Sequence, residues 1–168
     1  MESDFVRRHF CEDKLLIKKA IVNAIKRTVV LNGKTDQEDF VRLVILYMSA
    51  TIFFPNSLGS IGWSFIQHIE DLNKMNKISW PTVIHEYLMT QVRKHHKNPT
   101  HVSGCVILVL YWFCEHVDII SPFESSESKY PRILRWSLHD LAKKMATQSL
   151  EELPDDKVWK KFNYMHFF

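Results

Sequence analysis

The first predicted helix covers about residues 13–31, where apolar positions recur at intervals of three and four. Lys18, Lys19, Lys26 and Arg27 lie on the other side, so we expect one side of this helix to be buried and the other to face solvent. Gly33 then ends the pattern, because glycine accepts the left-handed conformation that is common at helix ends. The expected buried side consists of Ile17, Ala20, Ile21, Ala24, Ile25 and Thr28.

The second predicted helix begins at Thr35 and runs to Phe54, and most of its sides are apolar. Thr35 and Glu38 have the spacing of a capping box, in which each side chain bonds the backbone amide of the other residue. A helix that is apolar nearly all round belongs in the interior of a domain. Its main charge, Arg42, is therefore expected to form a structural ion pair, as is Arg132 later in the chain.

Shorter helical patterns follow these two. A third helix is predicted over about residues 61–75, and a fourth begins with Ser79 as N-cap and Pro81 in its first turn. The fourth helix ends in the basic run 93–97, and two short helices are predicted near the polar segment that follows residue 121, over 131–136 and 138–146. The third helix is expected to bury Trp63, Ile66, Ile69 and Leu72.

The longest apolar run is VSGCVILVLYWFCEH, residues 102–116. Its uninterrupted apolar part, residues 106–114, is too short to span a membrane, which takes about 18 residues. We therefore expect a buried helix. The predicted fold class is all-α: a single compact domain of about six to seven helices over residues 1–168, arranged around this central apolar helix. A content of only four glycines and six prolines also disfavours a β-sandwich, which needs many tight turns.

Charge and cysteine content narrow the class of protein further. The formal net charge of +3 is well below that of a dedicated nucleic-acid-binding domain. Three widely spaced cysteines, Cys11, Cys105 and Cys114, suggest free thiols in a reducing compartment. The first residues include several acids and form neither a signal peptide nor a transit peptide. We therefore expect a nuclear or cytoplasmic protein without a membrane segment.

The candidate metal ligands of the apolar run do not form a site. At about 100° per residue, Cys105 and Cys114 point about 180° apart, and Cys114 and His116 about 200° apart. His85 begins a stretch similar to the zinc motif H-E-x-x-H, but Met89 stands where the second histidine should be. We therefore expect idle buried thiols, no metal, no other cofactor and no enzymatic activity. An unrecognised hydrolase remains the least favoured alternative.

Two surfaces are candidates for binding. The tail after residue 154 is rich in aromatic residues and suits another protein or a second copy of the chain, unless it folds back on the body. Basic helix faces would contact the phosphates of a nucleic acid, although lysines on a helix surface also simply keep it soluble. The partner-binding candidates are Trp159, Phe162, Tyr164, Phe167 and Phe168, and the nucleic-acid-binding candidates are Lys18, Lys19, Lys26, Arg27, Arg93, Lys94 and Lys97.

Four segments together resemble the plant mobile domain family and its grass relatives: DFVRLVILYMSATIFFP, HIEDLNKMNKISWPTVIHEYLM, VSGCVILVLYWFCEH and YPRILRWS. They cover roughly residues 38–138, so the helix 13–31 and the tail 154–168 lie outside the resemblance. The resemblance implies a plant protein with a helical domain of transposable-element origin. In that family the domain is often joined to other modules, such as SUMO-type cysteine proteases, and some members look like nuclear factors linked to silencing. It implies no catalytic or binding residues.

Taken together, these patterns predict a non-enzymatic protein–protein interaction domain. The expected partner is another protein or a second copy of the chain, bound through the aromatic tail or the basic corner 93–97. The alternative is a nuclear factor that associates with nucleic acid through its basic helix faces.

Overall fold

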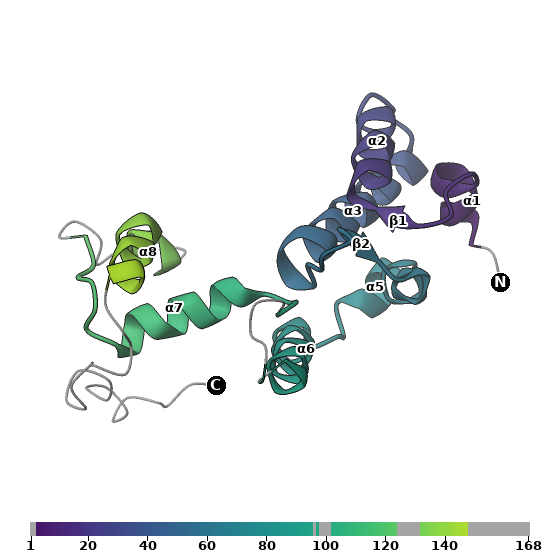
Figure 1. Ribbon diagram of the computed structural model, residues 1–168. Coiled ribbons are helices and arrows are strands. Elements are labelled where there is room, and N and C mark those ends of the chain that lie inside the picture. The colour runs from purple at the N-terminus through teal and green to yellow at the C-terminus, as the bar shows by residue number, and fades with distance from the viewer. Residues whose placement is uncertain (1–2, 96, 98–101, 124–131, 148–168) are drawn as a thin grey trace. The chain divides into compact units, whose positions relative to one another are not determined.

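The computed structural model describes residues 3–95, 97, 102–123 and 132–147 of the 168-residue chain. Within these ranges the fold is all-α, as predicted: eight α-helices and three short 3-10 or π-helical segments, with two strands of two residues each (Figure 1). The chain contains two compact units, Met1–Val106 and Ile107–Phe168, and the single domain expected from the sequence stays a prediction. No helix in the described part of the chain is long and apolar enough to cross a membrane.

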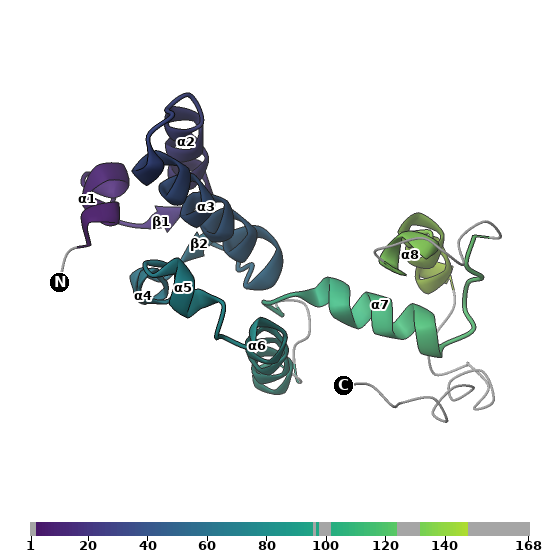
Figure 2. The same cartoon turned by 180° about the vertical axis from the view of Figure 1, so that it is seen from behind.

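The core of the first unit is built on α1 (Asp4–Phe10), α2 (Lys18–Thr28) and α3 (Lys34–Met48), which η1 (Ser49–Phe53) continues as a π-helix. Helices α2 and α3 lie side by side in both views (Figures 1 and 2). Most of the predicted buried side of α2 is confirmed, although Ile25 is half-buried and Ile17 is exposed. The buried apolar residues of this core are Phe5, Phe10, Leu16, Ala20, Ile21, Ala24, Leu43, Leu46, Ala50, Ile66 and Ile69.

A short antiparallel pair of strands joins two distant parts of the first unit. Strand β1 (Leu16–Ile17) pairs with β2 (Ser60–Ile61), and Leu16 lies opposite Ile61. Nearby, the Trp63 indole Nε1 donates a hydrogen bond to the Lys14 carbonyl oxygen at 3.1 Å. Because two residues are too few for an alternating pattern, the sequence did not reveal this pair. It also shortens the helix predicted over residues 13–31, which begins only at Lys18.

The single helix predicted over residues 61–75 is divided into η2 (Trp63–Phe65), α4 (Ile66–Ile69) and α5 (Leu72–Met75) (Figure 2). The break occurs at Asp71, whose carboxylate accepts hydrogen bonds from the backbone amides of Asn73 and Lys74. An aspartate in this position caps a new helix instead of continuing the old one. Ile66 and Ile69 are buried, as the spacing predicted, whereas Trp63 and Leu72 are half-buried.

The predicted helix starts are confirmed for α6 and wrong in detail for α3. Helix α6 (Trp80–Lys94) begins as expected, with Ser79 at the N-cap position and proline in the first turn. Helix α3 begins at Lys34, before the predicted cap, and the Asp36 carboxylate accepts a hydrogen bond from the Gly33 amide at 3.1 Å. The acid that reaches back is therefore Asp36, and Thr35 and Glu38 lie within the helix.

The second unit contains α7 (Val106–His116) except its first residue, together with η4 (Arg132–Arg135) and α8 (Leu138–Thr147). Helix α8 was predicted from its spacing. Its core is small. The buried members are Cys114, Val117, Ile119 and Leu141, with Leu110, Phe113, Ile120 and Trp136 packed against them. Leu110, Phe113, Cys114 and Val117 follow the spacing of one helix side, which packs with Leu141 of α8.

The run 102–116 is helical from Val106, as predicted, but within the second unit the expected burial of this helix is wrong. Cys114 is the one buried residue of α7, whereas the side chains of Ile107, Leu108, Val109 and Trp112 are each 40–45% exposed. An apolar composition does not bury a helix by itself, since a neighbour has to cover each of its sides. The core of the first unit is built around α3.

Gly104 explains how the chain passes α6 before α7 begins. Its φ angle is +106°, a conformation that side chains rarely adopt, and a Cβ atom there would lie 3.3 Å from the Leu88 Cα atom. The Gly104 amide also donates to the Pro55 carbonyl oxygen at 3.0 Å. Glycine is therefore required by both the backbone angle and the close approach.

Candidate functional site

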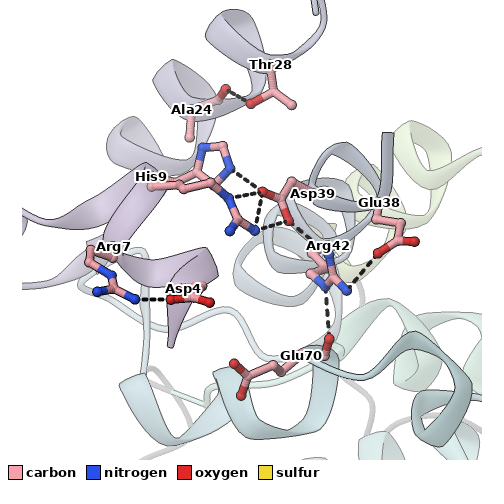
Figure 3. A network of polar contacts seen from close by, with 10 residues as sticks. Asp4, Arg7, His9, Ala24, Thr28, Glu38, Asp39, Arg42 and Glu70 are labelled. Carbon is pink, nitrogen blue, oxygen red and sulfur yellow. Dashed lines mark hydrogen bonds and ion pairs between the residues drawn. The ribbon is translucent and has the colours of Figure 1, made fainter. Parts of the chain in front are cut away.

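A fully buried carboxylate lies on the inner side of α3. The Asp39 side chain is 1% exposed, and within the described part of the chain its hydrogen bonds come from cationic or imidazole groups (Figure 3). Arg8 donates through Nε and Nη2 at 2.8 and 3.0 Å, the His9 Nε2 lies 2.9 Å away, and Arg42 donates through Nη1 at 2.9 Å. The predicted structural ion pair of Arg42 is thus confirmed, with Asp39 as its partner.

The partners of Asp39 connect four helical elements of the first unit. Arg8 and His9 belong to α1, while Asp39 and Arg42 belong to α3. Arg42 also donates through Nε to the carbonyl oxygen of Glu70, the residue after α4, at 3.0 Å. From α2, the Arg27 Nη2 donates to the His9 carbonyl oxygen at 3.0 Å. This Asp39 network therefore fixes the positions of α1, α2 and α4 relative to α3.

The environment of Asp39 stabilises its ionised form. Burial alone raises the pKa of this carboxyl, but the hydrogen bonds from His9 and Arg8, together with their charges, outweigh burial and hold the pKa below its ordinary value. A carboxylate offers about four acceptor positions, and the contacts from Arg8, His9 and Arg42 fill four. Asp39 therefore has no free acceptor position for a substrate proton, and its role is structural.

The opposite side of α3 carries apolar side chains that face solvent. At about 100° per residue, Val41 and Met48 lie about 200° and 180° from Asp39 around the helix axis. Val41 is 43% exposed, Met48 37% and Ile52, in the π-helical continuation, 45%. We call Val41, Met48 and Ile52 the outer stripe of α3. The helix thus buries a charge on one side and exposes apolar groups on the other.

The predicted basic residues of α2 lie on its solvent side. Lys18, Lys19, Lys26 and Arg27 are all exposed. Two of them have neighbours that hold them in place, since the Lys18 Nζ lies 5.7 Å from the centre of the Tyr47 ring and Arg27 reaches the His9 carbonyl. The structure brings these four residues together on one helix.

The other predicted binding residues lie at the end of α6 and in the C-terminal tail. Arg93, Lys94 and Lys97 are exposed at the end of α6. The five aromatic partner-binding candidates of the tail, from Trp159 to Phe168, lie outside the described residues, as does the beginning of the predicted helix 131–136. Arg132, the other predicted ion-pair residue, is exposed and has an interaction partner.

The cysteines and histidines considered as ligands lie in different environments. Cys105 and Cys114 are buried free thiols, as expected, and Cys11 is exposed. Burial, with a smaller contribution from the charge of Glu115, raises the pKa of Cys114. Among the residues that the structure describes, no group of three or more His, Cys, Asp or Glu side chains could hold a metal ion. His85 of the incomplete zinc motif is exposed on α6.

Sequence reasoning identified Arg42 but missed the residue that it holds. An acid at position 39, directly before the apolar run FVRLVIL, was itself unusual. The cluster Arg7-Arg8-His9 near the N-terminus supplied the matching charges, and the spacing of Asp39 and Arg42 allowed a contact within one helix turn. What the sequence could not show was that α1 folds onto α3, thirty residues away.

The comparisons with known proteins concern mainly the first unit. A family model described as Domain of unknown function (DUF8566) matches residues 2–110, which is more than half of the chain. The chain belongs to this family. No curated protein and no solved structure is significantly similar to it. The DUF8566 match covers the first unit, including both the Asp39 network and the outer stripe of α3, and leaves α8 outside.

Proposed function

We propose that this chain is a non-enzymatic protein–protein interaction domain, whose first unit binds an apolar helix of another protein along the outer stripe of α3. The observation that carries the proposal is the 37–45% exposure of Val41, Met48 and Ile52, opposite the buried side of the same helix. An apolar surface of this kind favours association, because water is released when it is covered.

The spacing of the outer stripe suits a helical partner. Its members are seven and four positions apart, so they follow one line along the helix, as in the contact lines of packed helices. Val44 and Ile45 are half-buried beside this line and widen the apolar surface. On the other side of α3 the Asp39 network holds the helix in place, so little conformational freedom is lost on binding.

The test compares two triple variants in affinity purification with quantitative mass spectrometry. The stripe variant combines Val41→Gln, Met48→Gln and Ile52→Gln. The matched control combines Val29→Gln, Val30→Gln and Leu31→Gln, which replace apolar residues that are 49–74% exposed after α2. We expect specific proteins to be retained by the wild type and the control and lost by the stripe variant. A purified protein from that set should bind the wild type directly.

The proposal is wrong if the stripe variant and the wild type retain the same proteins. Light scattering over a range of concentrations tests whether a second copy of the chain covers the outer stripe. In that case the wild type would be dimeric and the stripe variant monomeric. The aromatic tail remains a second proposed surface. Binding that survives Trp159→Ala and Phe162→Ala in one chain would exclude the tail.

Nucleic-acid association through the basic helix faces is the second candidate, favoured by the four exposed basic residues of α2. Phosphate contacts release counterions, so affinity for DNA or RNA should fall steeply as salt rises from low to physiological concentration. An absence of binding at about 50 mM salt would exclude this candidate.

The origin and location of the protein are part of the proposal. The resemblance of residues 38–138 to the plant mobile domain family supports a plant, transposable-element-related origin. The free thiols of Cys11, Cys105 and Cys114 support a reducing compartment, and we propose the nucleus or the cytoplasm. Tagging the full chain and imaging it in plant cells tests the location.

A further inference from the structure

The second unit contains a cavity of about 950 Å³ that the proposed function does not use. It lies where the end of α7, the segment 118–123 and the start of α8 meet. The Phe123 amide donates to the Arg135 carbonyl oxygen at 2.9 Å, which ties two of its walls together. Cavities of about 300–1,000 Å³ are typical of small-ligand sites.

Arg135 is the group in this cavity whose hydrogen bonding is incomplete. Its Nε is buried and has no hydrogen-bond partner among the residues that the structure describes. A buried donor of a charged group without an acceptor is costly, and such groups are usually satisfied by water, an ion or a ligand. Lys144 of α8 lines the same cavity, and neither cation forms a salt bridge within the described ranges.

The acids of the cavity limit the charge of a ligand. Glu115 accepts a hydrogen bond from the Trp136 indole at 3.1 Å, Asp118 has an interaction partner, and Asp140 lies in the first turn of α8. These three acids stand against the two cations Arg135 and Lys144, so the lining is negatively charged overall while His116 is neutral. This charge repels a dianion such as phosphate more strongly than a single carboxylate, which binds here by direct pairing with the planar guanidinium.

We propose that this cavity binds a ligand with one carboxylate on an apolar body, with the carboxylate at Arg135. The Ser137 hydroxyl, whose oxygen accepts from the Asp140 amide at 3.1 Å, has its own proton available for the same carboxylate. Ile119, Phe123 and Trp136 provide the apolar walls. Two sources have this chemistry: a free organic acid and the C-terminal residue of a peptide. The site belongs to the second unit and does not depend on the outer stripe of α3.

Isothermal titration of the full chain tests the proposal with phenylacetate, its uncharged analogue phenylacetamide, and inorganic phosphate. We expect phenylacetate to bind with one-to-one stoichiometry, phenylacetamide to bind at least about tenfold more weakly, and phosphate not to bind. The tripeptide Ala-Ala-Phe and its C-terminal amide distinguish the two sources. Tighter binding of the free tripeptide than of phenylacetate indicates a peptide ligand, and the reverse order indicates a small acid.

Three variants locate the binding site. Arg135→Gln should weaken phenylacetate binding at least about tenfold, and Arg135→Lys should weaken it less, because the charge remains while the planar pair is lost. Lys143→Gln is the matched control, since it removes a charge from α8 outside the cavity lining and should leave affinity unchanged. Circular dichroism confirms that each variant is folded. Equal binding of acid and amide, equal binding by Arg135→Lys and the wild type, or no binding of any carboxylate overturns the proposal.

Discussion

Helices α3 and α7 contain the two longest apolar runs of the chain, yet the fold uses them in opposite ways. Helix α3 carries several charged residues and still forms the centre of the first unit, where Asp39, Leu43 and Leu46 are buried. Helix α7 is almost entirely apolar, yet Cys114 is the one residue of it that is buried. The more apolar of the two helices is thus the more exposed.

The difference lies in what surrounds each helix. Around α3, the elements α1 and α4 are held by directional bonds to Asp39 and Arg42, and α2 is tied to α1 by the bond from Arg27 to the His9 carbonyl oxygen. In the described part of the second unit, α7 packs one side with Leu141 of α8. Apolar burial is non-directional, so a strongly apolar helix can pack against many different neighbours. A buried charge requires specific neighbours, because each missing partner leaves an unpaired group at a high cost in free energy.

The largest expected effect comes from removing the buried charge of α3. Asp39→Ala leaves the side chains of His9 and Arg42, which are 10% and 12% exposed, without their common acceptor. We expect the free energy of unfolding of the first unit to fall by about 3–5 kcal/mol, the usual result of breaking a buried ion pair. Urea unfolding followed by circular dichroism measures this change.

Glu38→Ala is the matched control for Asp39→Ala. Glu38 lies one position away on α3 and also pairs with Arg42, at 3.4 Å, but its side chain is 43% exposed. A surface pair of this kind contributes about 0–1 kcal/mol. If both substitutions destabilise the unit equally, the Asp39 network is not what distinguishes α3 from α7.

A pair of identical substitutions tests the comparison of the two helices directly. Leu46 of α3 is 0% exposed and Leu108 of α7 is 42% exposed, although both lie in apolar runs. Leu46→Ala should cost about 2–5 kcal/mol, because it removes buried contacts and leaves a cavity. Leu108→Ala should cost less than about 1 kcal/mol. Hydrogen exchange with mass spectrometry follows α3 and α7 separately in each variant, and comparable losses would show that α7 is buried after all.

These contrasts also show how much of the fold could be predicted from the sequence. Helical periodicity predicted the all-α class, the buried side of α2 and the start of α6, because each depends on neighbours within one element. It did not predict the break at Asp71, where one side chain bonds two amides locally, or the two-residue strands. It correctly placed the helix of residues 35–54 in an interior, as found for α3, but it also expected the run 102–116 to be buried, because burial depends on contacts between elements distant in the sequence.

Of the two candidate binding surfaces, the sequence predicted the basic side of α2 but not the outer stripe of α3. The basic residues of α2 were identified because charge and helical spacing agree there. The outer stripe of α3 was missed for the opposite reason: a helix that is apolar on most sides gives no indication of which side remains exposed. The buried side of α3 is instead the one that carries Asp39, whose partners Arg8 and His9 are about thirty positions away in the sequence.

The smallest expected effect is a difference in how the stability of α3 and of α7 depends on pH. Since the pKa of Asp39 lies below its unfolded value of about 3.9, its stabilising contribution is present above that value and is lost as pH falls through the lower folded pKa. The pKa of Cys114 is raised by burial, so its contribution is present below the ordinary thiol value of about 8.5 and is lost as pH rises through the higher folded pKa. Acid should therefore weaken α3 first, and alkali α7.

Hydrogen exchange, corrected for the intrinsic rate at each pH, should show protection of α3 falling at the acid end and protection of α7 falling at the alkaline end. Asp39→Asn should abolish the acid-dependent loss in α3 and leave the alkaline loss in α7 unchanged, since Asp39 belongs to the first unit and Cys114 to the second. Cys114→Ala should do the reverse. A common pH dependence of both helices that neither substitution alters would mean that other groups determine it, and that the buried charge of α3 and the buried thiol of α7 do not distinguish the two regions.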